Sequence, residues 1–135
     1  MRTLRSLALL ALVGLVANCG GGGGGGGGGP VDGVLILTLN TPNTADGAIL
    51  FRVNGGTVDS VSGSAMIADG SYNTVGTQTR IVAAGPITDG ALAYLYVPDV
   101  GDVTNYTVTV EQVAHNTTFA QRSLVGYSFA VSVAP

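Results

Sequence analysis

Apolar and small polar residues alternate with a period of two from Val34 to the end of the chain, and Gly, Pro, Asn and Asp interrupt the pattern at short intervals. This period is typical of strands with one buried face, and no helical stripe of apolar residues competes with it. The pattern predicts eight strands, at residues 34–39, 48–53, 57–61, 72–76, 79–83, 91–97, 106–113 and 125–133. Eight short strands at this spacing favour an all-β fold, an antiparallel β-sandwich of about eight strands.

The alternation also assigns faces to the predicted strands. In the last strand it points Val125, Tyr127, Phe129, Val131 and Val133 into the core. In the strand before, it points Tyr106, Val108 and Val110 inward and leaves Thr107, Thr109 and Glu111 on the solvated side. The first strand, residues 35–39, is apolar on both faces, which predicts a central strand covered on both sides.

Asp46-Gly47 and Asp89-Gly90 each stand directly before an apolar strand. Asp-Gly is favoured in tight turns, because glycine adopts positive φ and aspartate bonds to nearby backbone. We therefore expect both pairs to form turns, and we do not interpret their similarity as an internal repeat.

The first nineteen residues have the order of a secretory signal. Arg2 and Arg5 are followed by an apolar stretch over residues 7–16, which is too short to span a membrane. The next segment, Leu15-Val16-Ala17-Asn18-Cys19-Gly20, resembles the lipobox of bacterial lipoproteins, although Asn18 replaces the usual small residue before the cysteine. The resemblance implies lipidation of Cys19 and cleavage just before it. An ordinary signal-peptidase site beside a chance cysteine is the alternative.

Ten glycines, Gly20 to Gly29, separate Cys19 from Pro30. A glycine run cannot contribute to a core, and ordering it costs too much backbone entropy. As a flexible tether it would have a reach of roughly 17 Å. We therefore predict a signal peptide at 1–18, a lipidated cysteine and tether at 19–30, and one β-sandwich domain at 31–135.

The order of predicted elements resembles the cohesin-like modules, β-sandwiches related in fold to several carbohydrate-binding families. The similarity rests on residues 34–39, 47–53, 56–61, 80–82 and 87–97 and on the closing strand. It implies a cohesin-like or immunoglobulin-like sandwich with a protein-binding role, and a fold alone does not define a function.

Charge is sparse and excludes some partners. The chain has no lysine, and the segment after residue 18 keeps Arg52, Arg80 and Arg122 against eight carboxylates, a side-chain balance of 3 − 8 = −5. Nucleic-acid binding requires clustered cations, so no nucleic-acid partner is expected. A single cysteine also excludes an intrachain disulfide.

No pattern of catalytic residues is recognisable, and we predict neither an enzyme nor a cofactor. The only histidine, His115, follows a strand in a polar stretch, and Glu111 is the only glutamate. Asp99 and Asp102 flank a turn, and other turns supply Asp46, Asp69 and Asp89, but their spacing matches no calcium loop. No metal site is predicted.

Three tyrosines, Tyr72, Tyr94 and Tyr96, are the candidate ligand-binding residues. Tyr94 and Tyr96 project from one face of their strand, and the ordinary expectation is that one or both pack partly into the core. The leading hypothesis is an exported protein held by lipid in the bacterial envelope, with a non-catalytic module that binds an envelope or secreted protein or serves structurally. The alternative is a carbohydrate-binding module with a glycan ligand. We expect the outer membrane or cell surface rather than the inner membrane.

Overall fold

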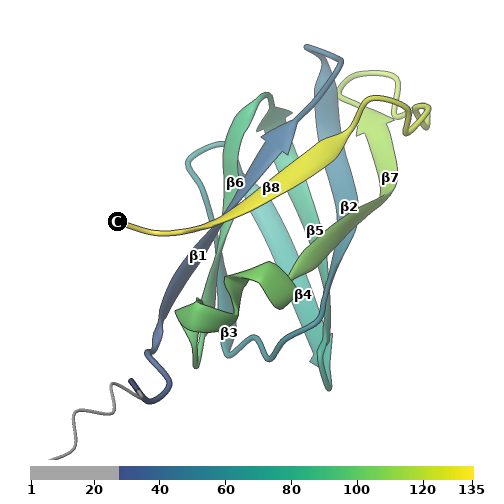
Figure 1. The fold of residues 1–135 in the computed structure, drawn as a ribbon. Helices are drawn as coiled ribbons and strands as arrows, with labels where there is room; N and C mark the ends of the chain where they lie inside the picture. The colour runs from purple at the N-terminus through teal and green to yellow at the C-terminus, as the bar shows by residue number, and fades with distance from the viewer. Residues whose placement is uncertain (1–27) are drawn as a thin grey trace, which may run out of the picture.

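The computed structural model describes residues 28–135. The predicted signal peptide and Cys19 lie outside the described residues. The chain forms two four-stranded antiparallel sheets that pack face to face, which confirms the predicted all-β sandwich of eight strands (Figure 1). In the part that the structure describes, no helix has the length and apolar character needed to cross a membrane.

Each sheet combines strands that are distant in the sequence. The first sheet has the order β3-β6-β1-β8 and the second has the order β4-β5-β2-β7. The strands are β1 (Gly33–Asn40), β2 (Asp46–Asn54), β3 (Ser60–Gly63), β4 (Asp69–Val75), β5 (Gln78–Ile87), β6 (Gly90–Val97), β7 (Thr107–His115) and β8 (Ser128–Val133). A short 3-10 helix, η1 (Val100–Asn105), connects β6 to β7 and packs Val100 and Val103 against the core.

The core lies between the two sheets and consists mainly of alternate residues of the strands. Leu35, Leu37 and Leu39 of β1 face Ile49, Phe51 and Val53 of β2, and all six side chains are buried. In the part of the chain that the structure describes, every strand and every buried apolar residue lies between Gly33 and Val133. Residues 30–135 therefore contain both sheets and the core between them.

Several strand boundaries differ from the prediction. Strand β3 begins at Ser60, although Val58 before it is buried. Strand β8 begins at Ser128, so the prediction that Val125 lies in the core is wrong, because it sits in a loop and is 83% exposed. Val133 at the other end of β8 is 43% exposed, whereas Phe129 packs against the core as predicted.

The side chains of β7 point as predicted, although its pairing with β2 contains an irregularity. Tyr106 is buried just before it, and Val108 and Val110 pack against the core, as predicted. The register with β2 shifts between Leu50 and Phe51, so that Glu111 opposes no residue of β2. This bulge lets Val113 face inward as well, three positions after Val110.

Strand β1 is central in its sheet, between β6 and β8, as its apolar sequence predicts. Its inward leucines are fully buried, but the outward Val34 and Ile36 are only half-buried. Among residues 28–135, no further sheet covers this side. The prediction that β1 is covered on both faces is therefore wrong, and an apolar outer surface results.

Candidate functional site

The outer face of the β3-β6-β1-β8 sheet carries two parallel rows of side chains. Tyr94 lies opposite Ile36 of β1 on one side and Ser62 of β3 on the other. Tyr96 lies in the same way between Val34 and Ser60, and Ser132 of β8 continues the first row beyond Ile36. We call the surface formed by Val34, Ile36, Ser60, Ser62, Tyr94, Tyr96 and Ser132 the tyrosine face.

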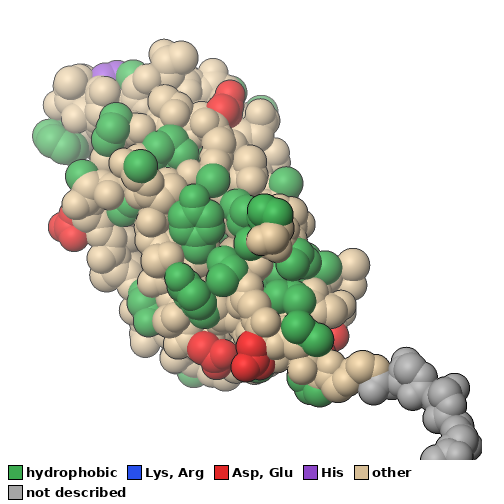
Figure 2. All heavy atoms as spheres, turned by 90° about the vertical axis from the view of Figure 1, so that its left-hand side faces the viewer, with side chains coloured by type: hydrophobic (Ala, Val, Ile, Leu, Met, Phe, Trp, Pro, Cys, Tyr) green, Lys and Arg blue, Asp and Glu red, His purple; other side chains and the backbone are tan. Residues whose placement is uncertain are grey.

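The tyrosine face has no charged side chain. Apolar groups gather at the centre of the molecule in Figure 2, which views the side where β8, β1 and β6 lie, while acidic groups appear only near its margin and no basic group is visible. Tyr96 is 46% exposed and Tyr94 is half-buried. Two neighbouring rings thus stand on the outer face of the sheet between aliphatic and hydroxyl side chains.

The three predicted ligand-binding tyrosines do not form one site. Tyr94 and Tyr96 both point outward, so the expectation that they pack partly into the core is wrong, because their partners Ile36 and Val34 occupy the outer side of β1. Tyr72 belongs to β4 in the other sheet, where it opposes the buried Ile81 and is 45% exposed. It lines a separate cleft at the edge of the sandwich.

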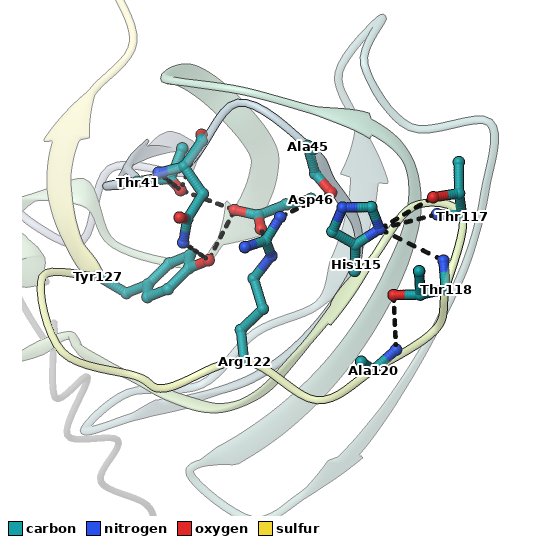
Figure 3. Close-up of polar contacts among 10 residues, drawn as sticks. Thr41, Ala45, Asp46, His115, Thr117, Thr118, Ala120, Arg122 and Tyr127 are labelled. Carbon is teal, nitrogen blue, oxygen red and sulfur yellow. Dashed lines mark hydrogen bonds and ion pairs between the residues drawn. The ribbon is translucent and has the colours of Figure 1, made fainter.

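A buried polar cluster surrounds Asp46 at the start of β2 (Figure 3). Its Oδ2 accepts hydrogen bonds from the Thr41 hydroxyl at 2.7 Å and the Tyr127 hydroxyl at 2.8 Å. Its Oδ1 lies 2.8 Å from Arg122 Nε, in an ion pair whose angle does not meet hydrogen-bond geometry. Asp46 itself is 1% exposed.

The cluster joins segments that lie far apart in the sequence. Arg122 also donates to the Ala45 carbonyl at 3.3 Å, and Asn43 donates to the Tyr127 hydroxyl at 2.7 Å. Burial raises the pKa of Tyr127, and its hydrogen bond to Asp46 acts in the same direction. Because the carboxylate is enclosed and contacts Thr41, Tyr127 and Arg122, the cluster connects the loop before β8 to the start of β2, and a substrate could not reach the carboxylate.

The prediction of a turn at Asp46-Gly47 is therefore wrong. Both residues belong to β2, where the register with β5 and β7 is irregular after Asp46. A Cβ on Gly47 would lie 2.4 Å from the Asn116 Cα, so glycine is needed here for close backbone approach. Asp89 lies in the two-residue connection between β5 and β6, and Gly90, with φ +128°, is the first residue of β6.

The opposite outer surface carries the other charged group. Glu111 contacts Arg52 at 2.6 Å and Arg80 at 2.9 Å, and the two arginines are directly opposed on β2 and β5. Arg122 is paired with Asp46, so all three arginines in residues 28–135 are in ion pairs. The carboxylate offsets repulsion between two neighbouring cations, which explains why a strand pair tolerates them.

The remaining candidate residues have local structural contacts. His115 Nδ1 lies 3.1 Å from the Thr117 backbone N–H and 3.3 Å from that of Thr118, so it acts as acceptor for a turn. Asp99 accepts from the Gly101 N–H at 2.8 Å at the start of η1. Within the described residues, no group of three or more His, Cys, Asp or Glu could hold a metal ion.

Sequence reasoning missed the Asp46 cluster and the side-by-side rows of the tyrosine face. One signal for the cluster was available, since Arg122 and Tyr127 lie close together just before the apolar closing strand. Their separation from Asp46, 76 and 81 positions, gives no local pattern that would pair them.

No family model, curated protein or solved structure matches the chain. The resemblance to cohesin-like modules and to the lipobox therefore stays a prediction.

Proposed function

We propose that this protein is a non-catalytic binding module, anchored by lipid to the bacterial envelope, whose tyrosine face binds a neutral polysaccharide. The observation that carries the proposal is the pair of neighbouring outward tyrosine rings on a sheet face without charged side chains. It favours the carbohydrate alternative over the protein-binding role that the cohesin-like pattern suggested.

The chemistry of the tyrosine face fits a sugar chain. Pyranose rings have apolar C–H faces and hydroxyl rims, and an aromatic side chain offers an apolar ring with a polar tip. Ser60, Ser62 and Ser132 add hydroxyls at both sides of the tyrosines. The absence of charge from the face makes an anionic or cationic polymer a poor partner, because nothing would compensate its desolvated charges.

The predicted anchor explains how such a face would be used. In Figure 1 the described chain leaves the domain at the start of β1, toward the glycine segment. A flexible glycine tether would let the domain reorient against an extended polymer. A weak individual contact suffices on a membrane that displays many copies, because simultaneous contacts raise the apparent affinity.

Removal of the tyrosine rings tests the face. In a panel of neutral polysaccharides, residues 30–135 should be retarded in affinity electrophoresis. Tyr94→Ala and Tyr96→Ala should each weaken the binding by about tenfold, since loss of an aromatic anchor typically costs more than 1 kcal/mol. Phe119→Ala is the matched control, because that ring is also aromatic and 80% exposed but lies in the loop after β7, outside the tyrosine face. Binding that survives the double tyrosine variant would refute the proposal, as would no retardation by any glycan.

The anchor has a separate test in the complete chain. Cys19→Ser should move the protein from the membrane fraction to the soluble fraction, because the thiol that would carry the acyl chains is lost. Asn18→Ala, which restores a small residue before the cysteine, is the control and should keep the membrane association. Unchanged fractionation of Cys19→Ser would contradict the lipoprotein assignment and leave the glycan test unaffected.

A further inference from the structure

The sandwich has one edge that is neither short nor covered. Strand β4 ends the order of its sheet, so its outer backbone has no strand partner among residues 28–135. It pairs with β5 in seven consecutive positions without a bulge. It carries one charged side chain, Asp69, and no lysine or proline. A long, regular edge with a single charge at its end is a template for pairing with another strand.

The other edges are protected. Strand β3 has four residues, and β8 lies against β7 of the opposite sheet. The C-terminal end of β7 is covered by the following segment, where Ala114 forms a bridge with Gln121 and Arg122 N–H donates to the Val113 carbonyl at 2.8 Å. Among the edge strands of residues 28–135, β4 is therefore the one that is long and uncovered.

The pairing of β4 with β5 shows which backbone groups are free. Thr74 and Thr79 are directly opposed, and their hydroxyls lie 2.9 Å apart. Such close side chains are typical of a non-hydrogen-bonded pair, whose backbone N–H and C=O groups point away from each other. By alternation, Gly70, Tyr72 and Thr74 present their backbone groups at the outer edge.

We infer that β4 is a homodimerisation edge, at which it pairs antiparallel with β4 of a second copy around Tyr72. Tyr72 is the centre of the seven-residue strand. A two-fold axis there opposes Tyr72 with its own copy and Gly70 with Thr74. Gly70, Tyr72 and Thr74, whose backbone groups point to the outer edge, then each oppose a residue of the second copy whose backbone groups also point to the edge. This pairing gives about six backbone hydrogen bonds. Pairing centred on Ser71 or Asn73 would oppose backbone groups that already bond to β5.

The side chains are complementary in the same register. Asp69 falls opposite Val75 of the second copy, so the two carboxylates lie at opposite ends of the paired strands and do not repel. Ser71 falls opposite Asn73, which are polar partners. A symmetric contact of this kind closes at two copies and does not propagate into a fibre.

A cleft beside β4 supplies apolar surface to the contact. It has a volume of about 340 Å³ and lies between β3 and β4, with Val61, Ile67, Ile81, Ala83 and Ala93 in its walls and Tyr72 at its side. Exposed Tyr72 and Val75 lie on this strand. A second β4 would continue the sheet across the mouth of the cleft, and both Tyr72 rings would lie on the same face, in contact with each other.

Sedimentation velocity of residues 30–135 between about 10 μM and about 1 mM tests the inference, since a small interface predicts weak association. The wild-type domain should shift from monomer to dimer across this range. Tyr72→Lys places two cations in opposition and should weaken the dimer at least tenfold. Val75→Lys places each cation beside Asp69 of the other copy and should strengthen it severalfold. A domain that stays monomeric throughout would overturn the inference.

Cross-linking tests the register independently of these substitutions. The opposed pair formed by Ser71 and Asn73 has a Cα separation of about 4.5 Å, within the range of a disulfide. A mixture of Ser71→Cys and Asn73→Cys chains, oxidised with diamide, should give disulfide-linked dimers, and each variant alone should give far fewer. Equal cross-linking of the single variants, or dimers that Tyr72→Lys leaves unchanged, would place the contact elsewhere and refute the inference.

Discussion

Asp46→Ala should destabilise the domain by about 3–5 kcal/mol, because it leaves the partly buried Arg122 without its counter-ion and two hydroxyls without an acceptor. Natural domains of this size have a free energy of unfolding on the order of 5–15 kcal/mol, so the loss is a large part of the total. Urea unfolding of residues 30–135, followed by circular dichroism, measures the change.

Matched variants separate the charge from the hydrogen bonds. Asp46→Asn keeps an acceptor for Thr41 and Tyr127 but removes the charge, and should cost less than Asp46→Ala. The combination of Asp46→Ala with Arg122→Ala should cost less than the sum of the single changes, since the second substitution removes an ion that the first left unpaired. A loss below about 1 kcal/mol for Asp46→Ala would show that the cluster has no structural role.

The strands were predictable because their signal is local. Alternation of apolar and polar residues follows directly from the pleat, so Tyr106, Val108 and Phe129 could be assigned to the core side without knowledge of their partners. The boundaries were less accurate where the alternation continues through a loop. Val125 has the same parity as Phe129, but the chain is not extended between them, and periodicity alone cannot detect this.

The candidate sites depend on information that a single strand does not carry. Both sides of β6 are apolar, and Leu92 and Ala93 are both buried beside an irregularity in its pairing with β1. The direction of Tyr94 and Tyr96 is therefore set by the register with β1 and β3. The free edge of β4 is likewise a property of strand order, since its sequence resembles that of any polar strand.

The Asp46 cluster could not be predicted from the sequence for a different reason. An Asp-Gly pair before an apolar run has a local explanation as a turn, and Asp89 does lie in the short connection between β5 and β6. What distinguishes Asp46 is a cation and a hydroxyl from the loop before β8. Buried polar networks are formed by tertiary contacts, and local propensity does not reveal them.

Phe51→Ala should also destabilise the domain by about 3–5 kcal/mol, the usual cost of a cavity of this size in a core. Phe51 of β2 has no exposed surface, and its ring centroid lies 4.7 Å from that of Phe129 in β8. Because β2 and β8 belong to different sheets, this pair connects the two layers of the sandwich. Thermal and urea unfolding of residues 30–135 measure the loss.

Two further phenylalanine variants make this prediction specific. Phe129→Ala should cost less than Phe51→Ala, since Phe129 is only partly buried, and Phe119→Ala should cost little because that ring is 80% exposed. The double variant at residues 51 and 129 should cost less than the sum, since their contact can be lost only once. If all three single variants lost the same stability, inter-sheet packing would not be the source of the effect, and the assignment of Phe51 to the centre of the core would be wrong.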